Sequence, residues 1–372
     1  MTAITAPPLA RCIAPTNAAL GESPIWIAGE GAVYWVDIEG ARIFRHVPAS
    51  AHTEVCDLPF AVSALAATAD GRLLCTARAS TFLLDPRTGE LTKASDLPGA
   101  RDGVRINDGC CHPDGAFWFG TMDIGERAPS GHFFRLAGSG ACEQIEASFI
   151  ITNGPAFNAN GSLGYFVDSV GRRILRVDLR HGRIAGTPSV FARIAPDQGY
   201  PDGLAVDADD GVWCCHWGGA RITRFDADGG VSAVLHLPVA NVTKCVFGGE
   251  ALDRLFVTTA RKGLDDAALA RQPQAGGLFE IEVGYRGFAS VPFRGSLREQ
   301  AFTHLQFFAI ADIQLTNTAA DCEQRAASPG GRQWNRNSKP SKSTLQAHSA
   351  ACGSPVPASL RITPGTITRN SN

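Results

Sequence analysis

The sequence predicts an all-β protein, a six-bladed β-propeller with a central metal site, followed by a C-terminal tail. Three observations support this. Gly is abundant at 40 residues, hydrophobic residues make up 44% of the chain, and a unit of two strand-like segments recurs at roughly 40 to 50 residues. Many Gly residues favour a turn-rich β protein. At 372 residues, the chain could form one large domain or two ordinary ones.

Each repeat unit contains an apolar strand, a turn and a second strand. Asp-Gly and Asn-Gly turns supply the positive backbone dihedrals that tight hairpins need. A unit alone would expose an apolar sheet face, whereas a ring of units buries both faces of every sheet. A two-sheet sandwich does not explain the period. The paired segments span residues 32–37 and 42–45, 70–75 and 81–85, 114–119 and 131–135, 160–166 and 173–178, 210–215 and 221–226, and 253–258 and 277–281.

The six units assign residues 1–295 to the propeller, and we expect residues 10–20 to pair with the last blade and close the ring. Residues 296–372 have a different character. They are rich in Ser, Thr, Asn, Gln and Pro, with one apolar run at 305–310. Such a composition buries little surface, so the tail is predicted to be disordered.

The net charge and the cysteine content limit which binding partners and which cellular compartment we expect for this protein. A net charge of −2 gives no reason to expect nucleic acid or a membrane surface. The 11 cysteines include no Cys-x-x-Cys, and the adjacent pairs at 110–111 and 214–215 favour reduced thiols in a cytoplasmic protein over disulfides. We find no signal peptide and no apolar run long enough to span a membrane, and we expect a monomer or a weak homo-oligomer.

The common catalytic signatures are absent from the sequence. There is no Gly-x-Ser-x-Gly, no Gly-x-x-x-x-Gly-Lys, no His-Glu-x-x-His and no Gly-x-Gly-x-x-Gly. His112 and His216 are interpreted as structural. The run 207–211 resembles the start of a calcium loop, but its twelfth position is Gly218 instead of Glu. A hairpin turn is therefore the better interpretation.

Three oxygen-bearing side chains occur in similar settings. Glu22, Asn153 and Asp202 each lie within two residues of both a Gly and a Pro, and each precedes a strand-like segment. One such residue alone would be a simple turn residue, but three at equivalent points of a repeat predict one shared site. Oxygen ligands suit Ca²⁺, Mg²⁺ or Mn²⁺ and do not exclude Fe²⁺ or Zn²⁺. Three ligands would leave positions open for water and substrate.

In a propeller, this shared site would lie at the mouth of the central channel, and further polar residues could line that mouth. Arg105 and Asn107 lie two residues apart, so they share one side of an extended segment and could bind a polyhydroxylated substrate. The alternative is a surface Arg and a turn Asn. For Trp217 and the segment 241–244, lining the mouth and packing are equally good interpretations.

Seven short motifs follow one another along the propeller sequence. They are Gly21-Glu22-Ser23-Pro24, Arg105-Ile106-Asn107-Asp108-Gly109, Phe119-Gly120-Thr121-Met122, Thr152-Asn153-Gly154-Pro155, Pro201-Asp202-Gly203, Phe247-Gly248-Gly249 and Thr258-Thr259-Ala260-Arg261-Lys262-Gly263-Leu264. In this order they resemble the family of gluconolactonase, regucalcin (senescence marker protein) and luciferin-regenerating enzyme, and the resemblance covers about residues 10–295. The segments 241–244 and 259–264 are most similar to bacterial sugar-lactone lactonases.

The resemblance implies a lactonase, a hydrolase acting on a carboxylic ester. One divalent cation (Ca²⁺, Zn²⁺, Mn²⁺, Mg²⁺ or Fe²⁺) would be bound by Glu22, Asn153 and Asp202, and Arg105 and Asn107 would bind the substrate. The expected reaction is hydrolysis of a sugar (aldono-) lactone to the aldonic acid, with the cation as Lewis acid and Asp202 as general base. Some members use an acidic residue after Gly-Thr-Met, which leaves Asp123 and Glu126 as open alternatives here.

Other functions stay open at this stage. A calcium-binding regulatory propeller would bind calcium without turnover. An aryl-ester or phosphotriester hydrolase would share the architecture but hold its metals with a larger ligand set. A purely structural propeller would leave Glu22, Asn153 and Asp202 without a shared purpose.

Overall fold

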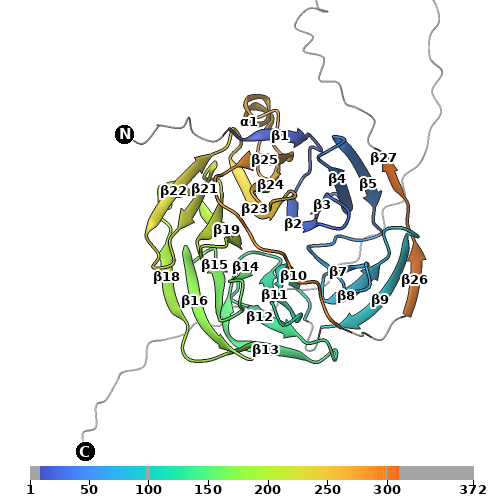
Figure 1. Cartoon of the computed structure of the whole chain (residues 1–372), viewed down its shortest axis with the longest axis horizontal. Helices are drawn as coiled ribbons and strands as arrows, with labels where there is room; N and C mark the ends of the chain where they lie inside the picture. Colours follow the sequence, from blue (N-terminus) through green and yellow to red (C-terminus); the bar gives the residue numbers. More distant parts are fainter. Residues whose placement is uncertain (1–8, 98–100, 296, 298–299, 310–372) are drawn as a thin grey trace, which may run out of the picture. The chain divides into compact units, whose positions relative to one another are not determined.

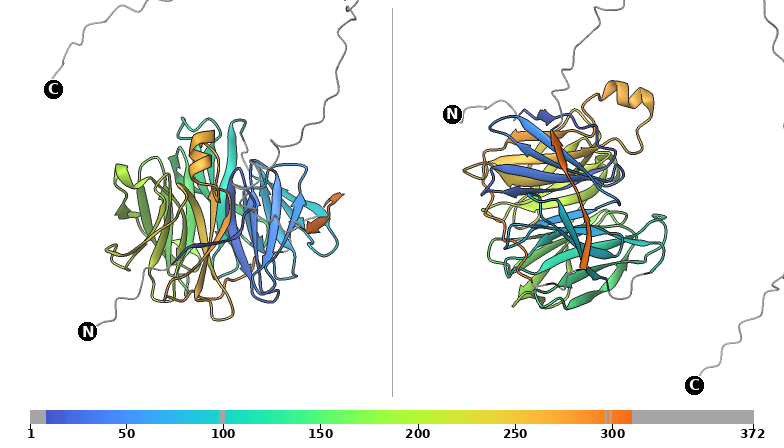
Figure 2. Two further views of the ribbon diagram at one scale, coloured as in Figure 1. Left: turned by 90° about the horizontal axis from the view of Figure 1, so that it is seen from above. Right: turned by 90° about the vertical axis from the view of Figure 1, so that its right-hand side faces the viewer.

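The chain is described by a computed structural model, in which residues 9–97, 101–295, 297 and 300–309 are described. Its strands form six antiparallel sheets arranged as a ring (Figure 1), which confirms the six-bladed β-propeller. Figure 2 shows the blades edge-on, with their strands running between the two faces of the ring. The central metal site remains a prediction.

In each blade the first three strands follow one another from the centre of the ring outward, and blades 1 to 6 are numbered here by their first strands. The first strands are β2 (Gly21–Ile27), β6 (Ala64–Ala67), β10 (Val104–Cys111), β14 (Thr152–Phe157), β19 (Tyr200–Val206) and β23 (Asn241–Gly248). The second strands are β3 (Ala32–Asp37), β7 (Leu73–Ala77), β11 (Phe117–Asp123), β15 (Leu163–Asp168), β20 (Val212–Trp217) and β24 (Arg254–Ala260).

The two outer positions of each blade complete the sheets. The third strands are β4 (Arg42–Val47), β8 (Ser80–Leu84), β12 (Gly131–Leu136), β16 (Arg173–Arg180), β21 (Arg221–Phe225) and β25 (Leu278–Glu282). The outer strands are β5 (His52–Asp57), β9 (Glu90–Asp96), β13 (Cys142–Phe149), β18 (Ser189–Arg193), β22 (Val231–His236) and β1 (Arg11–Ala14). The remaining elements are β17 (Arg183–Ile184), the 3-10 turn Pro196–Gln198, α1 (Asp266–Arg271), β26 (Gln300–His304) and β27 (Phe307–Ala309).

The N-terminal strand closes the ring, as the sequence predicted. β1 pairs antiparallel with β25, so the first strand of the chain is the outer strand of the last blade. Glu280 on β25 forms ion pairs with Arg11 of β1 and with Arg254 of β24. The distance from Arg254 Nη1 to Glu280 Oε1 is 2.7 Å. Blade 6 is therefore built from both ends of the propeller sequence.

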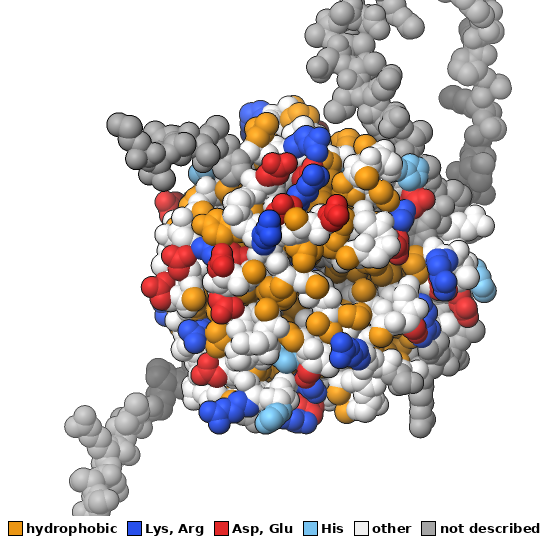
Figure 3. Space-filling model, in the orientation of Figure 1, with side chains coloured by type: hydrophobic (Ala, Val, Ile, Leu, Met, Phe, Trp, Pro, Cys, Tyr) orange, Lys and Arg blue, Asp and Glu red, His pale blue; other side chains and the backbone are white. Residues whose placement is uncertain are grey.

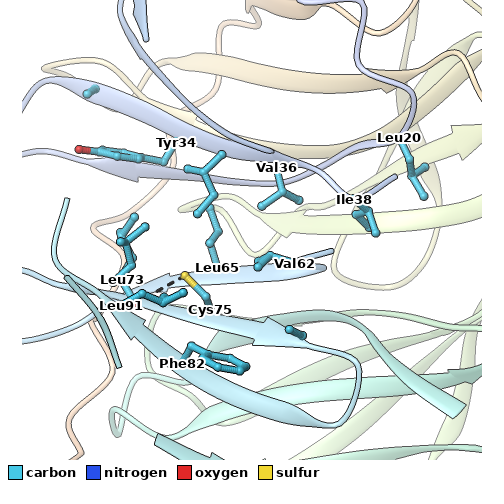
Figure 4. Packing of buried hydrophobic residues seen from close by; sticks show 14 of the residues in the cluster. Leu20, Tyr34, Val36, Ile38, Val62, Leu65, Leu73, Cys75, Phe82 and Leu91 are labelled. Atoms are coloured by element: carbon cyan, nitrogen blue, oxygen red, sulfur yellow. Dashed lines mark hydrogen bonds between the residues drawn. The ribbon is translucent and has the colours of Figure 1, made fainter. Parts of the chain in front are cut away.

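A hydrophobic cluster fills each interface between neighbouring blades. Because successive strand residues point to opposite faces of a sheet, each second strand contributes to two clusters. Cys214 packs toward blade 4 and Cys215 toward blade 6. This alternation explains why two adjacent cysteines do not form a disulfide, and the nine cysteines of the described part are all free thiols. Figure 4 shows the cluster between blades 1 and 2.

Residues 283–295 form a strap that crosses one face of the ring after β25 (Figure 1). Its backbone bonds to the β19–β20 turn of blade 5, where Ala208 N donates to Arg286 O at 2.8 Å. At its far end Phe293 N donates to Ala67 O of blade 2 at 2.7 Å, and its buried ring joins the cluster between blades 2 and 3. The strap therefore connects blades on opposite sides of the ring.

Strand pairing extends beyond the predicted boundary at residue 295. β26 pairs with β9, and β27 pairs with β5, so two short strands lengthen blades 2 and 1 at their outer edges. The outer edge of a sheet offers unpaired backbone groups that can accept another strand, which accounts for pairing by a segment with little amphipathic pattern. The rest of the tail, residues 310–372, lies outside the described residues, and its disorder stays a prediction.

Several side chains have the structural roles that the sequence indicated. Asp207 Oδ1 accepts the backbone N–H groups of Asp209 at 3.0 Å and Gly211 at 2.8 Å, which is a hairpin turn. His112 and His216 are buried, and each has a ring nitrogen at hydrogen-bond distance from a backbone carbonyl oxygen. In the described part of the chain, no helix has the length and apolar character needed to cross a membrane.

Candidate active site

Shifts in the pairing register of three first strands lie beside the predicted ligand residues of the candidate site. The pairing register shifts after Glu22 in β2, after Asn153 in β14 and after Pro201, next to Asp202, in β19. A β-bulge bends its strand and re-aims the side chains around it. Of the Gly and Pro residues that the sequence analysis used as its signal, Pro24, Gly154, Pro155 and Gly203 lie inside these shifted stretches, whereas Gly21 and Pro201 pair in register beside them. Glu22, Asn153 and Asp202 therefore lie at similar points of three first strands.

These bulges open onto a cavity of about 400 Å³ at one end of the central channel. All five predicted site residues line this cavity, so the structure brings together Glu22, Arg105, Asn107, Asn153 and Asp202. Blades 1, 3, 4, 5 and 6 all contribute. The other lining residues are Leu20, Ile38, Met122, Glu126, Ile151, Ser169, Val170, Tyr200, Pro201, Trp217 and Lys262.

A hydrogen-bond chain orients the amide of Asn153. Its Nδ2 donates to Ser169 Oγ at 3.0 Å, and its Oδ1 accepts from Asn107 Nδ2 at 2.9 Å. The same Asn107 nitrogen donates to Thr152 O at 2.8 Å. Both amide hydrogens of Asn107 are thus used, and the Asn153 amide is fixed by donors and acceptors on both of its ends. An amide oxygen has two lone pairs, so Asn153 Oδ1 retains one for a ligand.

Burial and nearby negative charge raise the pKa of both carboxylates of the site. Burial raises the pKa of Glu22 to about 8, and the negative charge of Asp108 adds to this, whereas Lys244 opposes it. Burial also raises the pKa of Asp202 well above its ordinary value, and the charges of Glu22 and Asp108 add to that effect. Buried like charges favour protonation or a bound cation.

The donor set fits a divalent cation. Two buried carboxylates and one oriented amide oxygen are the hard oxygen ligands that such cations prefer. Among the described residues, no cluster of three or more His, Cys, Asp or Glu side chains could hold a metal. A cation site here therefore depends on the oxygen of Asn153 as well as on Glu22 and Asp202.

A buried ion pair lies next to the carboxylates and was not predicted. Lys244 Nζ of β23 donates to Asp108 Oδ1 at 2.5 Å and to Gly109 O at 3.0 Å, both on β10. Burial alone would lower the pKa of Lys244, but the negative charge of Asp108 outweighs it, so this pKa lies above its ordinary value. The pair joins opposite blades across the channel, so sequence proximity gave no sign of it.

Arg105 supplies a positive charge to the cavity. Its Nη1 donates to Ile106 O at 3.1 Å, which fixes the guanidinium beside β10. Burial lowers the pKa of Arg105, and the charges of Glu22, Glu126 and Glu39 oppose that shift. The remaining N–H groups of the guanidinium can bind oxygen atoms of a ligand.

The two acidic residues that the sequence analysis left open lie differently in the loop after β11. Glu126 lines the cavity, whereas Asp123 turns back into its own loop, where its Oδ2 accepts Arg127 N at 2.9 Å. Lys262, which the sequence analysis did not assign to the site, lies at the mouth and pairs with Glu39 at 3.0 Å and Glu126 at 3.6 Å. Its side chain comes from blade 6 and that of Glu126 from blade 3, so the pair spans the mouth.

Trp217 and the segment 241–244, for which lining the mouth and packing were both open, differ in their position. Trp217 lines the cavity. Within the segment 241–244, Asn241 Nδ2 donates to Lys262 O at 2.9 Å and Thr243 Oγ1 to Gly21 O at 2.6 Å, so these side chains hold the mouth backbone in place.

A second cavity occupies the opposite end of the channel. It measures about 360 Å³, and its lining includes Trp26, Phe157, Leu204 and Phe247, the strap residues Phe288–Pro292, and Lys244. Figure 3 shows hydrophobic side chains gathered around the centre of the ring in the orientation of Figure 1. The channel thus has one polar end at the carboxylates and one apolar end at the strap.

The fold and the site place this chain in the class of six-bladed propellers that carry carboxylate and amide oxygens in a pocket at one end of the central channel. Residues 20–261 match the family described as SMP-30/Gluconolactonase/LRE-like region, and the chain belongs to this family.

Known relatives cover the propeller. The chain is 36% identical over 293 residues to L-arabinolactonase of Azospirillum brasilense, covering 78% of this chain and 97% of that protein. It is 28% identical over 295 residues to regucalcin of Oryctolagus cuniculus, covering 77% and 98%. A solved structure of regucalcin from Agrobacterium tumefaciens, described as a calcium-binding protein, is 34% identical with a TM-score of 0.74, covering 77% and 98%.

Proposed function

We propose that this chain hydrolyses a sugar lactone to the corresponding aldonic acid and that a divalent cation is required. Membership of the family and the similarity to an L-arabinolactonase support lactone hydrolysis. The single observation that carries the proposal is the shared cavity, in which Glu22, Asn153 and Asp202 face the same space as Arg105 and Asn107. The substrate is a small molecule, and free thiols in the described part are consistent with a cytoplasmic protein.

Glu22, Asn153 and Asp202 are the proposed ligands of the cation, which can be Ca²⁺, Zn²⁺, Mn²⁺, Mg²⁺ or Fe²⁺. When bound, it supplies Lewis-acid stabilisation of the negative charge that develops on the lactone carbonyl oxygen. The hydrogen bonds of Asn153 to Asn107 and Ser169 support this assignment, because they point the amide oxygen away from Ser169. Lys244 and Arg105 reduce the repulsion between the carboxylates.

Arg105 and Asn107 are the proposed substrate ligands. Since both amide hydrogens of Asn107 are already donated, its Oδ1 is the atom that would accept a hydroxyl of the sugar. The Arg105 guanidinium can donate to the lactone oxygens. These two contacts would hold the ring with its carbonyl toward the carboxylates, the orientation that hydrolysis needs.

Asp202 is the proposed general base. Its carboxylate would accept a proton from the attacking water while the oxygen of that water bonds to the lactone carbonyl carbon. The ring C–O bond then breaks, and the ring oxygen takes up a proton to become the hydroxyl of the aldonic acid. No covalent intermediate on the protein is required, which agrees with the absence of a nucleophile motif from the sequence.

The test is acid release from xylono-, arabinono-, glucono- and galactono-lactone. The protein is stripped with a chelator and refilled with one cation at a time, beside Asp202→Ala and a control, Val231→Ser, whose side chain is exposed on β22. We expect one or two lactones to be hydrolysed with a restoring cation, by the wild type and the control but not by Asp202→Ala. Hydrolysis no faster than the spontaneous reaction with every cation would refute the proposal.

A second candidate is a calcium-binding propeller without turnover, which the described calcium binding of the Agrobacterium regucalcin favours. Calorimetric titration with Ca²⁺ separates the two. Tight calcium binding together with no hydrolysis of any lactone would support this candidate. A phosphotriester and an aryl ester belong in the same panel, because turnover of either would indicate the third kind of propeller hydrolase.

A further inference from the structure

The walls of the candidate active site are more apolar than a sugar requires. Above the carboxylates, hydrophobic side chains from blades 1, 3, 4 and 5 surround the cavity. A polyhydroxylated lactone can use the polar floor but has few groups that match such a wall. The apolar lining residues are Leu20, Ile38, Met122, Ile151, Val170, Tyr200 and Trp217.

Part of this wall is exposed to solvent. Eight large hydrophobic side chains are exposed in the described part of the chain, and two of them, Val170 and Tyr200, line this cavity with 42% and 43% of their surface accessible. A third, Ile124 at 46%, lies two residues after the lining residue Met122. Apolar groups that gather around a polar pocket and remain in water usually mark a binding surface.

The wall is held in place before any ligand binds. The guanidinium of Arg172 lies 3.8 Å from the centre of the Tyr200 ring and also donates to Gly199 O, the residue before it. Leu20 and Ile38 belong to the cluster between blades 1 and 2, and Figure 4 shows them together at one end of it. A preformed wall requires little ordering when a ligand binds.

We propose that this wall lets the enzyme take lactones with an alkyl substituent on the ring, in addition to hydroxylated ones, and that Val170 and Tyr200 contact the alkyl group. The proposal rests on the lactone hydrolysis proposed above. The lactone carbonyl lies at the floor, near Asp202, and the substituent points to the exposed wall. Hydrolysis adds one water across the ring ester, which yields a carboxylate, a proton and a hydroxyl on the carbon that bears the alkyl group.

The test is a series of five-membered lactones substituted at the ring carbon next to oxygen with methyl, ethyl, propyl or butyl, compared with the unsubstituted ring. With the full chain and its restoring cation, we expect kcat/KM to rise about fourfold per added methylene until the wall is covered. Val170→Ser should flatten this rise. Val231→Ser, an exposed valine on β22 away from the cavity, should leave it unchanged. A wild-type series without any rise, or an unchanged rise in Val170→Ser, would overturn the proposal.

A binding measurement separates this proposal from the hydrolysis itself. Cyclopentanones with the same alkyl groups lack the ester bond and cannot be hydrolysed. We expect their affinity, measured by calorimetry, to increase along the series in wild type and in Asp202→Ala. If no lactone is hydrolysed but this increase is present, lactonase function fails and the apolar wall stands. If lactones are hydrolysed and the ketone affinities do not change with chain length, the wall has no role in recognition.

Discussion

Blades 2 and 4 have the same strand order but contribute very differently to the site. β6 of blade 2 pairs with β7 in regular register from Ala64 to Ala67, whereas β14 of blade 4 shifts register between Asn153 and Ala156. Blade 4 gives four residues to the cavity lining, and the described residues of blade 2 give none. The propeller repeat alone therefore does not produce a site, and the irregularity in the first strand accompanies it.

The same relation holds around the ring. The first strands β2, β10, β14, β19 and β23 all show a register shift, and their five blades all line the cavity. A regular strand alternates its side chains strictly, whereas a bulge lets a polar side chain leave that alternation. The candidate site thus coincides with local breaks of the repeat, as is often found at functional positions.

The sharpest way to test the comparison is Asp202→Asn. We expect kcat/KM on the best lactone to fall at least about 1000-fold, because both a proposed cation ligand and the proposed base are lost. The chelated protein should keep its stability, because burial already favours the protonated, uncharged form of Asp202, which Asn resembles in size and charge. Activity within about tenfold of wild type would show that Asp202 is not central.

The matched control is Ser63→Ala at the start of blade 2. Ser63 Oγ lies 3.0 Å from Thr76 Oγ1 in a buried contact. Losing this hydrogen bond should cost about 1 kcal/mol of unfolding free energy and leave kcat/KM unchanged. A loss of activity comparable with that of Asp202→Asn would remove the distinction between blade 2 and the others.

Lys244→Met tests the buried pair that joins blades 3 and 6. Leaving Asp108 buried without its cation should lower the unfolding free energy by about 3–5 kcal/mol in urea. The double variant Asp108→Asn/Lys244→Met removes both charges and should recover most of this loss. If the single variant were as stable as wild type, the ion pair would not hold the channel together.

The pH dependence of the metal-free protein tests the paired carboxylates. The pKa of Glu22 rises from 4.5 to about 8, so the folded state binds more protons than the unfolded state between these values. Its contribution is fully present below pH 4.5 and is lost as pH rises through about 8. The unfolding free energy of chelated protein should therefore fall by a few kcal/mol over this range.

Glu22→Gln should flatten that dependence. Added cation should stabilise the wild type more at pH 8 than at pH 5, because binding requires deprotonated carboxylates. Thermal unfolding at several pH values, with and without cation, measures both effects. Equal stabilisation at both pH values would argue against Glu22 as a ligand.

The smallest expected effect at the candidate site comes from Gly154→Ala, within the bulge of β14. Gly154 has a φ of +68°, and a Cβ there would meet Tyr165 O at 3.4 Å, so there is room but an unfavourable backbone conformation. We expect a loss of about 1–2 kcal/mol of stability together with weaker cation binding. Gly71→Ala, at φ +85° in the open β6–β7 turn of blade 2, should lose similar stability without changing cation affinity. If Gly154→Ala bound the cation as tightly as the wild type does, the bulge of β14 would have no role in the cation site.

The sequence was sufficient for the architecture and for the grouping of five predicted residues around one cavity, whereas their roles in binding and catalysis stay predictions. The turn dipeptides and the period indicated the second and third strands of each blade, such as β3 and β4. The Gly and Pro residues beside Glu22, Asn153 and Asp202 indicated where the first strands become irregular. These signals are local, because a tight turn or a bulge restricts which residues can occupy it.

Contacts between distant segments could not be predicted in this way. Lys244 and Asp108 are 136 residues apart, and each has an ordinary strand context. Asp123 accepts a backbone N–H group of its own loop, whereas Glu126 lines the cavity, and this difference depends on how the loop folds. The pairing of β26 depended on a free sheet edge, which no residue of the tail encodes.

The closure of blade 6 by β1 imposes a waiting time on the newly made chain. Residues 11–14 leave the ribosome early, but their partner β25 ends at residue 282. At roughly 5–20 residues per second, translation takes on the order of 15–55 s to reach that point. During this interval the first strand has no sheet to join, and the growing arc of blades presents an open apolar face at each end. The earliest strand to be synthesised is therefore the one that completes the last blade, and blade 6 cannot be completed before β25 has been made.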